Sequence, residues 1–577
     1  MERRVLLAIT LSFLVLFLYQ AYFVPPPQDS AGNASTQIAR NTPPMAPAAI
    51  NAAASNQAPA APATAPTPQT AVVGDTAERD IVVETQKVRA VFTNRGARLK
   101  DWQLKEFRAD SGEPLDLVPR TTTILPFSLR LDDATAAAKL NDALYRVTGG
   151  SGTAVDATGQ DAAVTFEVEL ADGLRARKVF AFEPQSYIVT VSISVQQGSQ
   201  AISPTVQWGP GLGDDIAQTS PGSFFSPNYI YKAQAIFHID GSVERIPVQT
   251  IANGLTRDGQ FRWIGVDDHY FISAILQPAS PLHVEYHHAV IPTATTPAIA
   301  ADYVSYEVKV PSTEGMRFYV GPKQLDVMRS IDPEFTRAIY FGMFAVLAAP
   351  LLDGLKWIHG YIGDWGWSII VLTILINLAM FPLRHKSVVS MRKMQELQPQ
   401  LKAIQDRYAK YKITDPERQK MNTEVMDLYK ARGVNPASGC VPTLLTMPFL
   451  FAFYAMLGQA IEIRGEGFLG WIPDLSRSDP YYITPLLMGL TMFWQMRLQP
   501  ATADPTQQKV MMFMPIMISV TMLFAPAGLV IYWLVSNLWG IGQQYFTNYL
   551  IGPPKVHNVR PPAMSRPKDP TGRGPVN

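Results

Sequence analysis

The stretch Ser368–Leu383, SIIVLTILINLAMFPL, is apolar enough to cross a bilayer, yet Thr373 and Asn377 lie in its middle and Arg384 follows it directly. On a helix, residues four apart share one face, and a further seven residues bring Arg384 onto the same stripe. Polar side chains facing lipid tails are costly. The spacing therefore predicts a membrane helix whose polar stripe faces something other than lipid.

The composition concentrates apolar residues in particular parts of the chain. Of 577 residues 47% are hydrophobic, and the apolar runs lie at the N-terminus and after residue 340. With 49 basic and 48 acidic residues the net charge is +1, so no chain-wide field for DNA binding exists and DNA is not an expected partner. The single cysteine, Cys440, excludes an intrachain disulfide and gives no zinc cluster.

Shifts in pattern divide the chain into segments. Alternating runs such as Tyr187–Val195 are typical of strands, whereas the Pro- and Ala-rich stretch before them lacks the apolar residues that a core needs. We expect a transmembrane anchor at 1–24, a disordered linker at 25–79, an all-β sandwich at 80–320, amphipathic interfacial helices at 321–363, a core of five transmembrane helices at 364–550, and a basic tail at 551–577. The five crossings are expected at 365–383, 440–460, 481–497, 510–525 and 528–547.

The distribution of charge predicts the topology. The loop between Arg384 and Arg432 holds twelve basic and six acidic residues, a net charge of +6, which places it in the cytoplasm as a helical hairpin at 384–434. The tail is also basic, whereas 462–479 is net acidic. The predicted fold is a polytopic α-helical membrane protein of six transmembrane helices with both ends inside and a large all-β sandwich outside.

Polar residues recur in every one of the five predicted core crossings. Interhelical hydrogen bonding is the usual role of such a residue, but the recurrence favours a hydrated cavity within the membrane. The eight histidines all lie outside these crossings and no phosphate-binding Gly-Lys-Ser/Thr loop is present, so we expect no intramembrane Ser–His pair and no use of ATP by the chain itself. His287 and His288 alternate along a predicted strand, cannot share a face, and are interpreted as structural.

Five motifs identify a resemblance to a known family. They are GDWGWSII at 363–370, NPASGCVP at 435–442, DPYYI at 479–483, DPTQQK at 504–509 and GLVIYWLVSN at 528–537. In these motifs, and along nearly its whole length, the chain resembles the YidC membrane protein insertases of the YidC/Oxa/Alb family in their Gram-negative form. The resemblance implies a protein of the bacterial inner membrane with its β domain in the periplasm. It also implies a hydrophilic groove, open to cytoplasm and lipid, that receives polar parts of nascent membrane proteins. It further implies action without a cofactor, so we expect no catalytic residue, no metal and not an enzyme.

The chain departs from that family at one position. The family usually carries Arg or Lys in the groove, where this sequence has Asn377. Either Arg384 reaches back along its stripe to supply the charge, or a polar, wet groove works without a fixed cation. We favour the second account, because Arg384 would have to reach most of ~10 Å past Pro382.

The resemblance implies a set of site residues and partners. The expected groove residues are Thr373, Asn377, Thr446, Gln495, Tyr532, Trp533 and Ser536, with Arg384 as a candidate cation at the groove mouth. Expected partners are nascent membrane proteins, the lipid bilayer, the Sec translocon, and the ribosome and targeting factors through the basic hairpin. A secondary transporter is the alternative function, and a scaffold anchoring the β domain is a third; paired intramembrane acids or inverted repeats would favour the transporter, and neither is evident.

Overall fold

A computed structural model describes residues 71–551, except 110, 123, 150–152, 211, 213–232, 293–299, 311–314, 412–414, 434–440 and 499–504. The expected anchor at 1–24, most of the linker, and nearly all of the tail lie outside the described residues. Residues 403–432 belong to a different compact unit from the remainder of the described chain, so this unit is treated by itself.

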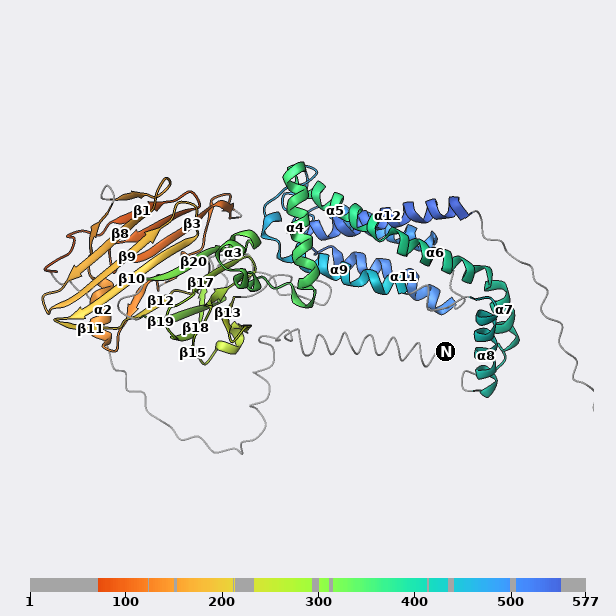
Figure 1. Ribbon diagram of the computed structural model, residues 1–577, viewed down its shortest axis with the longest axis horizontal. Coiled ribbons are helices and arrows are strands. Elements are labelled where there is room, and N and C mark those ends of the chain that lie inside the picture. The colour runs from red at the N-terminus through yellow and green to blue at the C-terminus, as the bar shows by residue number, and fades with distance from the viewer. Residues whose placement is uncertain are drawn as a thin grey trace, which may run out of the picture. The chain divides into compact units, whose positions relative to one another are not determined.

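The strands lie between Asp80 and Pro322 and form three sheets (Figure 1). The first has the order β4-β3-β2-β1-β7 and contains β1 (Asp80–Glu84), β2 (Val88–Thr93), β3 (Arg98–Arg108), β4 (Pro114–Asp116) and β7 (Ala154–Asp156). The second has the order β14-β13-β16-β17-β20-β10-β9-β8-β6, with β11 beside β10, and contains β6 (Arg146–Thr148), β8 (Ala162–Glu169), β9 (Leu174–Phe182), β10 (Ile188–Gln197), β11 (Gln200–Ile202), β13 (Gln234–Ile239), β14 (Ser242–Pro247), β16 (Trp263–Asp267), β17 (Phe271–Leu276) and β20 (Met316–Pro322). The third has the order β15-β18-β19-β12-β5 and contains β5 (Ser128–Arg130), β12 (Thr205–Trp208), β15 (Leu255–Gly259), β18 (Leu282–Pro292) and β19 (Ala300–Lys309).

Both smaller sheets pack on one face of the large sheet. Val189 of β10 lies opposite both Phe182 of β9 and Phe318 of β20, so these three side chains share a face. Trp102 of the first sheet stacks on Phe182, with ring centroids 6.2 Å apart, and Trp208 of the third sheet stacks on Phe318 at 6.5 Å. The predicted β sandwich is therefore confirmed, with two sheets side by side forming its second layer.

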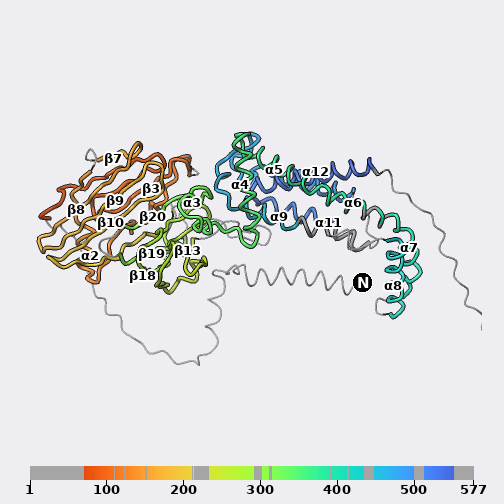
Figure 2. The backbone as a smooth tube through the Cα atoms, viewed as in Figure 1, coloured from red at the N-terminus to blue at the C-terminus, as the bar shows by residue number. Residues whose placement is uncertain are grey.

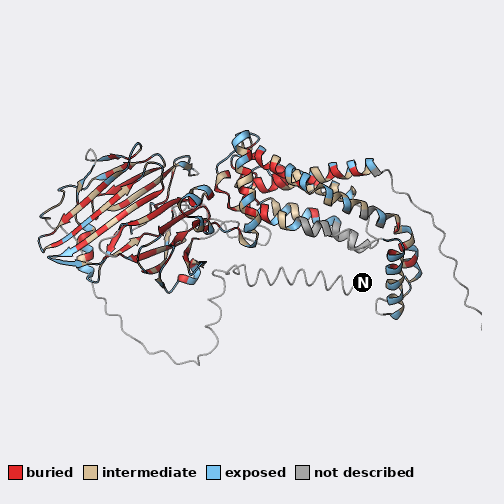
Figure 3. Ribbon diagram, in the orientation of Figure 1, coloured by how far each residue is buried: buried red, intermediate tan, exposed pale blue. Residues whose placement is uncertain are grey.

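Alternation along the strands creates this core. In β9 every second residue from Leu174 to Phe182 is buried, and β10 shows a similar alternation over most of its length. Figure 3 shows buried segments running through the strands of this domain. Figure 2 shows β8, β9 and β10 running side by side, as their register requires. An apolar residue at every second position thus gives each strand one face for the core.

The β domain begins earlier than the sequence indicated. Residues 71–79 were expected to belong to the linker, but the Val72 and Val73 amides both donate to the Glu169 carbonyl, at 2.8 and 3.2 Å. Asn94 Nδ2 also donates to the Ala77 carbonyl at 2.9 Å. This segment has too few apolar residues to resemble a strand, and its backbone bonds hold it to the domain instead.

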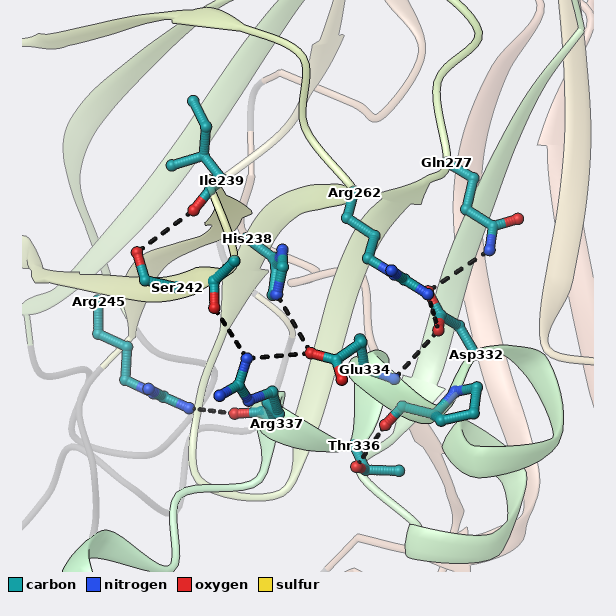
Figure 4. Close-up of polar contacts among 12 residues, drawn as sticks. His238, Ile239, Ser242, Arg245, Arg262, Gln277, Asp332, Glu334, Thr336 and Arg337 are labelled. Atoms are coloured by element: carbon teal, nitrogen blue, oxygen red, sulfur yellow. Dashed lines mark hydrogen bonds and ion pairs between the residues drawn. The ribbon is translucent and has the colours of Figure 1, made fainter.

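The segment after β20 is fixed to the β domain by charged side chains (Figure 4). It contains α3 (Leu325–Ile331), the short helices η3 (Pro333–Ala338) and η4 (Gly342–Phe344), and α4 (Ala345–Ile362). The Arg262 guanidinium donates to both oxygens of Asp332, at 2.6 and 2.8 Å, and these bonds lower the pKa of that carboxyl. Asp332 also caps η3 by accepting from the Glu334 amide, and Glu334 Oε2 lies 3.5 Å from His238 Nε2.

Helices follow where the membrane crossings were expected. They are α5 (Trp365–Ala379), α9 (Val441–Gln459), α10 (Ile483–Leu498), α11 (Pro505–Met522) and α12 (Ala527–Ile551). Helix α6 (Phe381–Glu396) follows α5 and lies mostly in the predicted hairpin. Helix α12 contacts α5, α6, α9 and α10, and is central to this part of the chain. Over the described residues, none of the helices combines the length and the apolar character that a membrane crossing requires.

The predicted hairpin contains α7 (Gln398–Arg407) and α8 (Pro416–Ala431). Helix α8 begins at the cap Asp415, whose side chain accepts from the Glu417 amide at 3.0 Å, and ends before Gly433, which has a φ of +61°. The Tyr408 hydroxyl donates to Glu424 at 2.9 Å across the turn. The start and the stop of α8 thus follow from local sequence signals.

Candidate functional site

The polar stripe of the opening sequence forms a hydrogen-bonded cluster. Asn377 is 4% exposed, and its Nδ2 donates to the Thr373 carbonyl at 2.8 Å and to Ser536 Oγ of α12 at 3.4 Å. Arg384 Nη1 donates to Asn377 Oδ1 at 2.7 Å. A guanidinium carries only donors, so it must face the amide oxygen, and both ends of the amide are then satisfied.

The backbone between α5 and α6 brings Arg384 to this place. Helix α5 ends at Ala379, but Met380 keeps helical dihedral angles of −82° and −7°. The Arg384 amide donates to the Met380 carbonyl at 3.1 Å, so the helical direction continues through Pro382. Residues 377 and 384 therefore lie two helical turns apart on one stripe. The long side chain of Arg384 spans the distance between them.

This geometry removes the reason for which we favoured the account without a fixed cation. We favoured a polar cluster without a fixed cation, because the reach past Pro382 looked too long. The guanidinium does make that reach and lies within hydrogen-bond distance of Asn377. In the described part of the chain no carboxylate forms an ion pair with Arg384, so its positive charge has no acidic partner there.

The two aromatic residues of α12 have different surroundings. Tyr532 is 8% exposed, and its ring stacks on Phe453 of α9 with centroids 4.2 Å apart. Trp533 is half-buried. Ser536 lies one turn after Tyr532, so α12 presents both residues along one face. Phe453 had not been singled out, because the sequence alone did not show which apolar residue would face Tyr532.

A second polar cluster lies between α10 and α12. The Asn537 amide, 5% exposed, is 3.4 Å from Thr491 Oγ1 and 3.5 Å from the Met488 carbonyl. Gln495 belongs to this contact, because a methyl group added at Gly540 of α12 would overlap its side chain. Gln495, one of the expected groove residues, therefore contacts α12 at Gly540. Gly540 lies one helical turn after Ser536, which bonds to Asn377.

Two further expected residues have limited contact with the cluster. Thr373 is fully buried, and its hydroxyl donates to the Ile369 carbonyl of its own helix at 2.6 Å. Thr446 lies in α9, and its side chain is outside the described residues. The described residues include one set with metal-ligand spacing, and it belongs to β18 and β19 rather than to these helices.

Comparison with known proteins agrees with this architecture. The model of the 60Kd inner membrane protein family matches residues 357–553, and that of the YidC periplasmic domain matches residues 80–353. The membrane protein insertase YidC of Geobacter metallireducens is 31% identical over 556 residues, which cover 95% of this chain and 98% of that protein. The insertase YidC of Cupriavidus necator is 33% identical over 567 residues, covering 96% and 98%.

A crystal structure of an active YidC insertase aligns with 83% of this chain and 95% of its own chain, with 18% sequence identity and a TM-score of 0.34. This structural likeness is too weak to carry an argument. The sequence relatives and the two family models, each covering the expected part of the chain, are sufficient without it. The chain therefore belongs to the YidC family of membrane protein insertases, which are not enzymes, and is an inner membrane protein with a periplasmic β-sheet domain.

Proposed function

We propose that the cluster of Asn377, Arg384 and Ser536, with Tyr532 beside it, lines a hydrophilic groove that receives the polar part of a membrane protein during insertion. The observation that carries this proposal is the bond from Arg384 to Asn377. It holds a guanidinium, which has no acidic partner among the described residues, beside a buried amide in the membrane region. Such a charge attracts an acidic segment of a client more strongly in surroundings of low dielectric constant than in water.

The same proposal assigns the charge to a different helix. The resemblance implies a basic residue at the position of Asn377 on α5, and here Arg384 supplies that charge from the first turn of α6. Thr373, Thr446, Gln495 and Trp533 are proposed as further groove residues on the basis of the resemblance. A secondary transporter is set aside, because the family to which the chain belongs consists of insertases.

Site-specific photocrosslinking to stalled nascent chains tests the groove. A photoreactive residue at Ser536 or at Asn377 should crosslink a single-span client with an acidic translocated end. Leu490 of α10, which is 62% exposed, is the matched control on a helix surface. Equal crosslinking from Leu490, or no crosslinking from Ser536, would show that the client takes another path.

The insertion partners are also proposals. We infer that the protein acts alone or beside the Sec translocon, and that the basic hairpin binds the ribosome or targeting factors. The net charge of +6 supports the second part, and Lys410 and Lys430 are exposed on that hairpin. Replacing both by Glu should weaken ribosome co-sedimentation at low salt. The same change at Lys100 in the β domain should have no effect.

A further inference from the structure

Three side chains with metal-binding chemistry converge on the outer face of the third sheet. Glu285 and His287 are two residues apart on β18, so they point to the same side, and Glu307 of β19 lies directly opposite Glu285. Their neighbours Tyr286 and Tyr306 point the other way and are fully buried in the core. One ligand atom from each of the three side chains lies within 4.8 Å of the others.

The distances inside this group are too long for hydrogen bonds. His287 Nε2 is 3.7 Å from Glu285 Oε2 and 3.7 Å from Glu307 Oε1. This nitrogen is shielded from solvent, and among the described residues it has no hydrogen-bond partner. Buried polar atoms normally have one. Ligands bound tetrahedrally to zinc at about 2.0–2.1 Å lie roughly 3.4 Å apart, close to the two distances from His287 Nε2.

Neighbouring side chains hold the two carboxylates in place. Gln207 Nε2 donates to Glu307 Oε1 at 2.5 Å, and His283 Nε2 lies 3.2 Å from Glu285 Oε1. Second partners of this kind orient metal ligands in many proteins. Glu307 is only 7% exposed, so its charge needs compensation.

Arg130 neutralises only part of the negative charge. Its guanidinium lies 2.6 Å from Glu307 Oε2 and 3.0 Å from Glu285 Oε2. The two facing carboxylates carry two negative charges, and this guanidinium supplies one positive charge. Like charges directly opposite on neighbouring strands destabilise a sheet. A divalent cation between His287 and the two carboxylates would remove this repulsion and give the imidazole nitrogen its partner.

We propose that Glu285, His287 and Glu307 form a binding site for a divalent transition-metal ion, with Zn2+ as the ion that this nitrogen and oxygen donor set fits. Imidazole and carboxylate are established ligands of zinc, and three protein ligands leave a position open to water. Spacing along the sequence did not indicate this site, because Glu307 comes from another strand. The site is independent of the proposed groove.

Zinc titration of the full-length protein in detergent tests the proposal. After treatment with a chelator, the parent should take up about one equivalent of Zn2+ in competition with a chromophoric chelator. His287→Gln and Glu307→Gln should each weaken Zn2+ binding roughly tenfold or more. Thermal unfolding of each variant without metal checks that the variant is folded. His288→Gln is the matched control, because His288 is the next residue and pairs with Asp302 instead, at 2.8 Å.

The outcomes are distinct. Loss of binding in the two ligand variants and its retention in His288→Gln supports the site, and X-ray absorption should then show nitrogen and oxygen ligands at about 2.0–2.1 Å. No saturable uptake of Zn2+ by the parent overturns the proposal. Equal affinity in His287→Gln and the parent overturns it as well.

Discussion

The buried ion pair between Lys323 and Asp267 holds the chain where it leaves β20. Lys323 Nζ lies 2.9 Å from Asp267 Oδ2 and donates to the Asp268 carbonyl at 2.6 Å. The two side chains are 5% and 1% exposed, and Asp267 Oδ1 has no hydrogen-bond partner in the part of the chain that the structure describes. Lys323→Met keeps most of the side-chain volume and removes the charge, so Asp267 would remain as a buried carboxylate without its counter-ion.

The size of the effect follows from this burial. Removing one partner of a buried ion pair costs about 3–5 kcal/mol, because the remaining charge is neither hydrated nor compensated. For a domain of this size, each kcal/mol lowers Tm by about 2–4 °C. Lys323→Met should therefore lower the Tm of the β domain by roughly 6–20 °C.

Thermal unfolding of the full-length protein in detergent, followed by tryptophan fluorescence, measures this shift. Lys100→Met is the matched control, because Lys100 pairs with Asp80 at 2.7 Å with both side chains at least 40% exposed. Such a surface pair contributes at most about 1 kcal/mol. The double variant Asp267→Asn/Lys323→Met should recover much of the loss. The reasoning is refuted when Lys323→Met shifts Tm no further than Lys100→Met.

Three other predictions concern the packing and capping of single elements. Gly366→Ala should lower the free energy of unfolding by about 1–3 kcal/mol, because the added methyl group at the start of α5 would overlap the Phe468 ring. In the same melting assay Gly360→Ala in α4 should be neutral or stabilising, because its added methyl group would have no described atom within 4 Å. Asp479→Ala should lower the free energy of unfolding by about 2 kcal/mol in thermal unfolding, because the Asp479 carboxylate accepts hydrogen bonds from two backbone amides and one hydroxyl at the start of α10. Asp479→Asn should lower it less. Arg262 lowers the pKa of Asp332 in the folded state. The contribution of Asp332 to stability is therefore present above about pH 4 and is lost as the pH falls through the folded pKa. In denaturant unfolding measured at several pH values, Arg262→Gln should reduce this loss of stability at acid pH.

Local periodicity accounts for what the sequence predicted about the membrane region. Thr373, Asn377 and Arg384 were placed on one stripe by helical spacing alone, and the bond between Asn377 and Arg384 confirms it. The end of α8 before Gly433 has an equally local cause, because a glycine in the left-handed region commonly follows a helix. The reach of Arg384 was misjudged, since side-chain extension does not follow from spacing.

Contacts between distant segments could not be predicted in this way. The sandwich was expected from alternation, but not that β5 pairs with β12 or that β1 pairs with β7 in parallel. Such pairings depend on the whole core rather than on the strands themselves. For the same reason the face-to-face position of Glu285 and Glu307, and the partner of Tyr532 on α9, became visible only in the structure.

Moving the positive charge between α5 and α6 tests the proposed groove most directly. Insertion of a single-span client with an acidic translocated end is measured for three proteins, which are the parent, Arg384→Ala and the double variant Asn377→Arg/Arg384→Ala. A client with a neutral translocated end is the control. Arg384→Ala should impair the acidic client more than the neutral one, and the double variant should restore insertion, because position 377 then carries the charge itself. Normal insertion of the acidic client by Arg384→Ala, or a double variant as defective as the single one, would contradict the account.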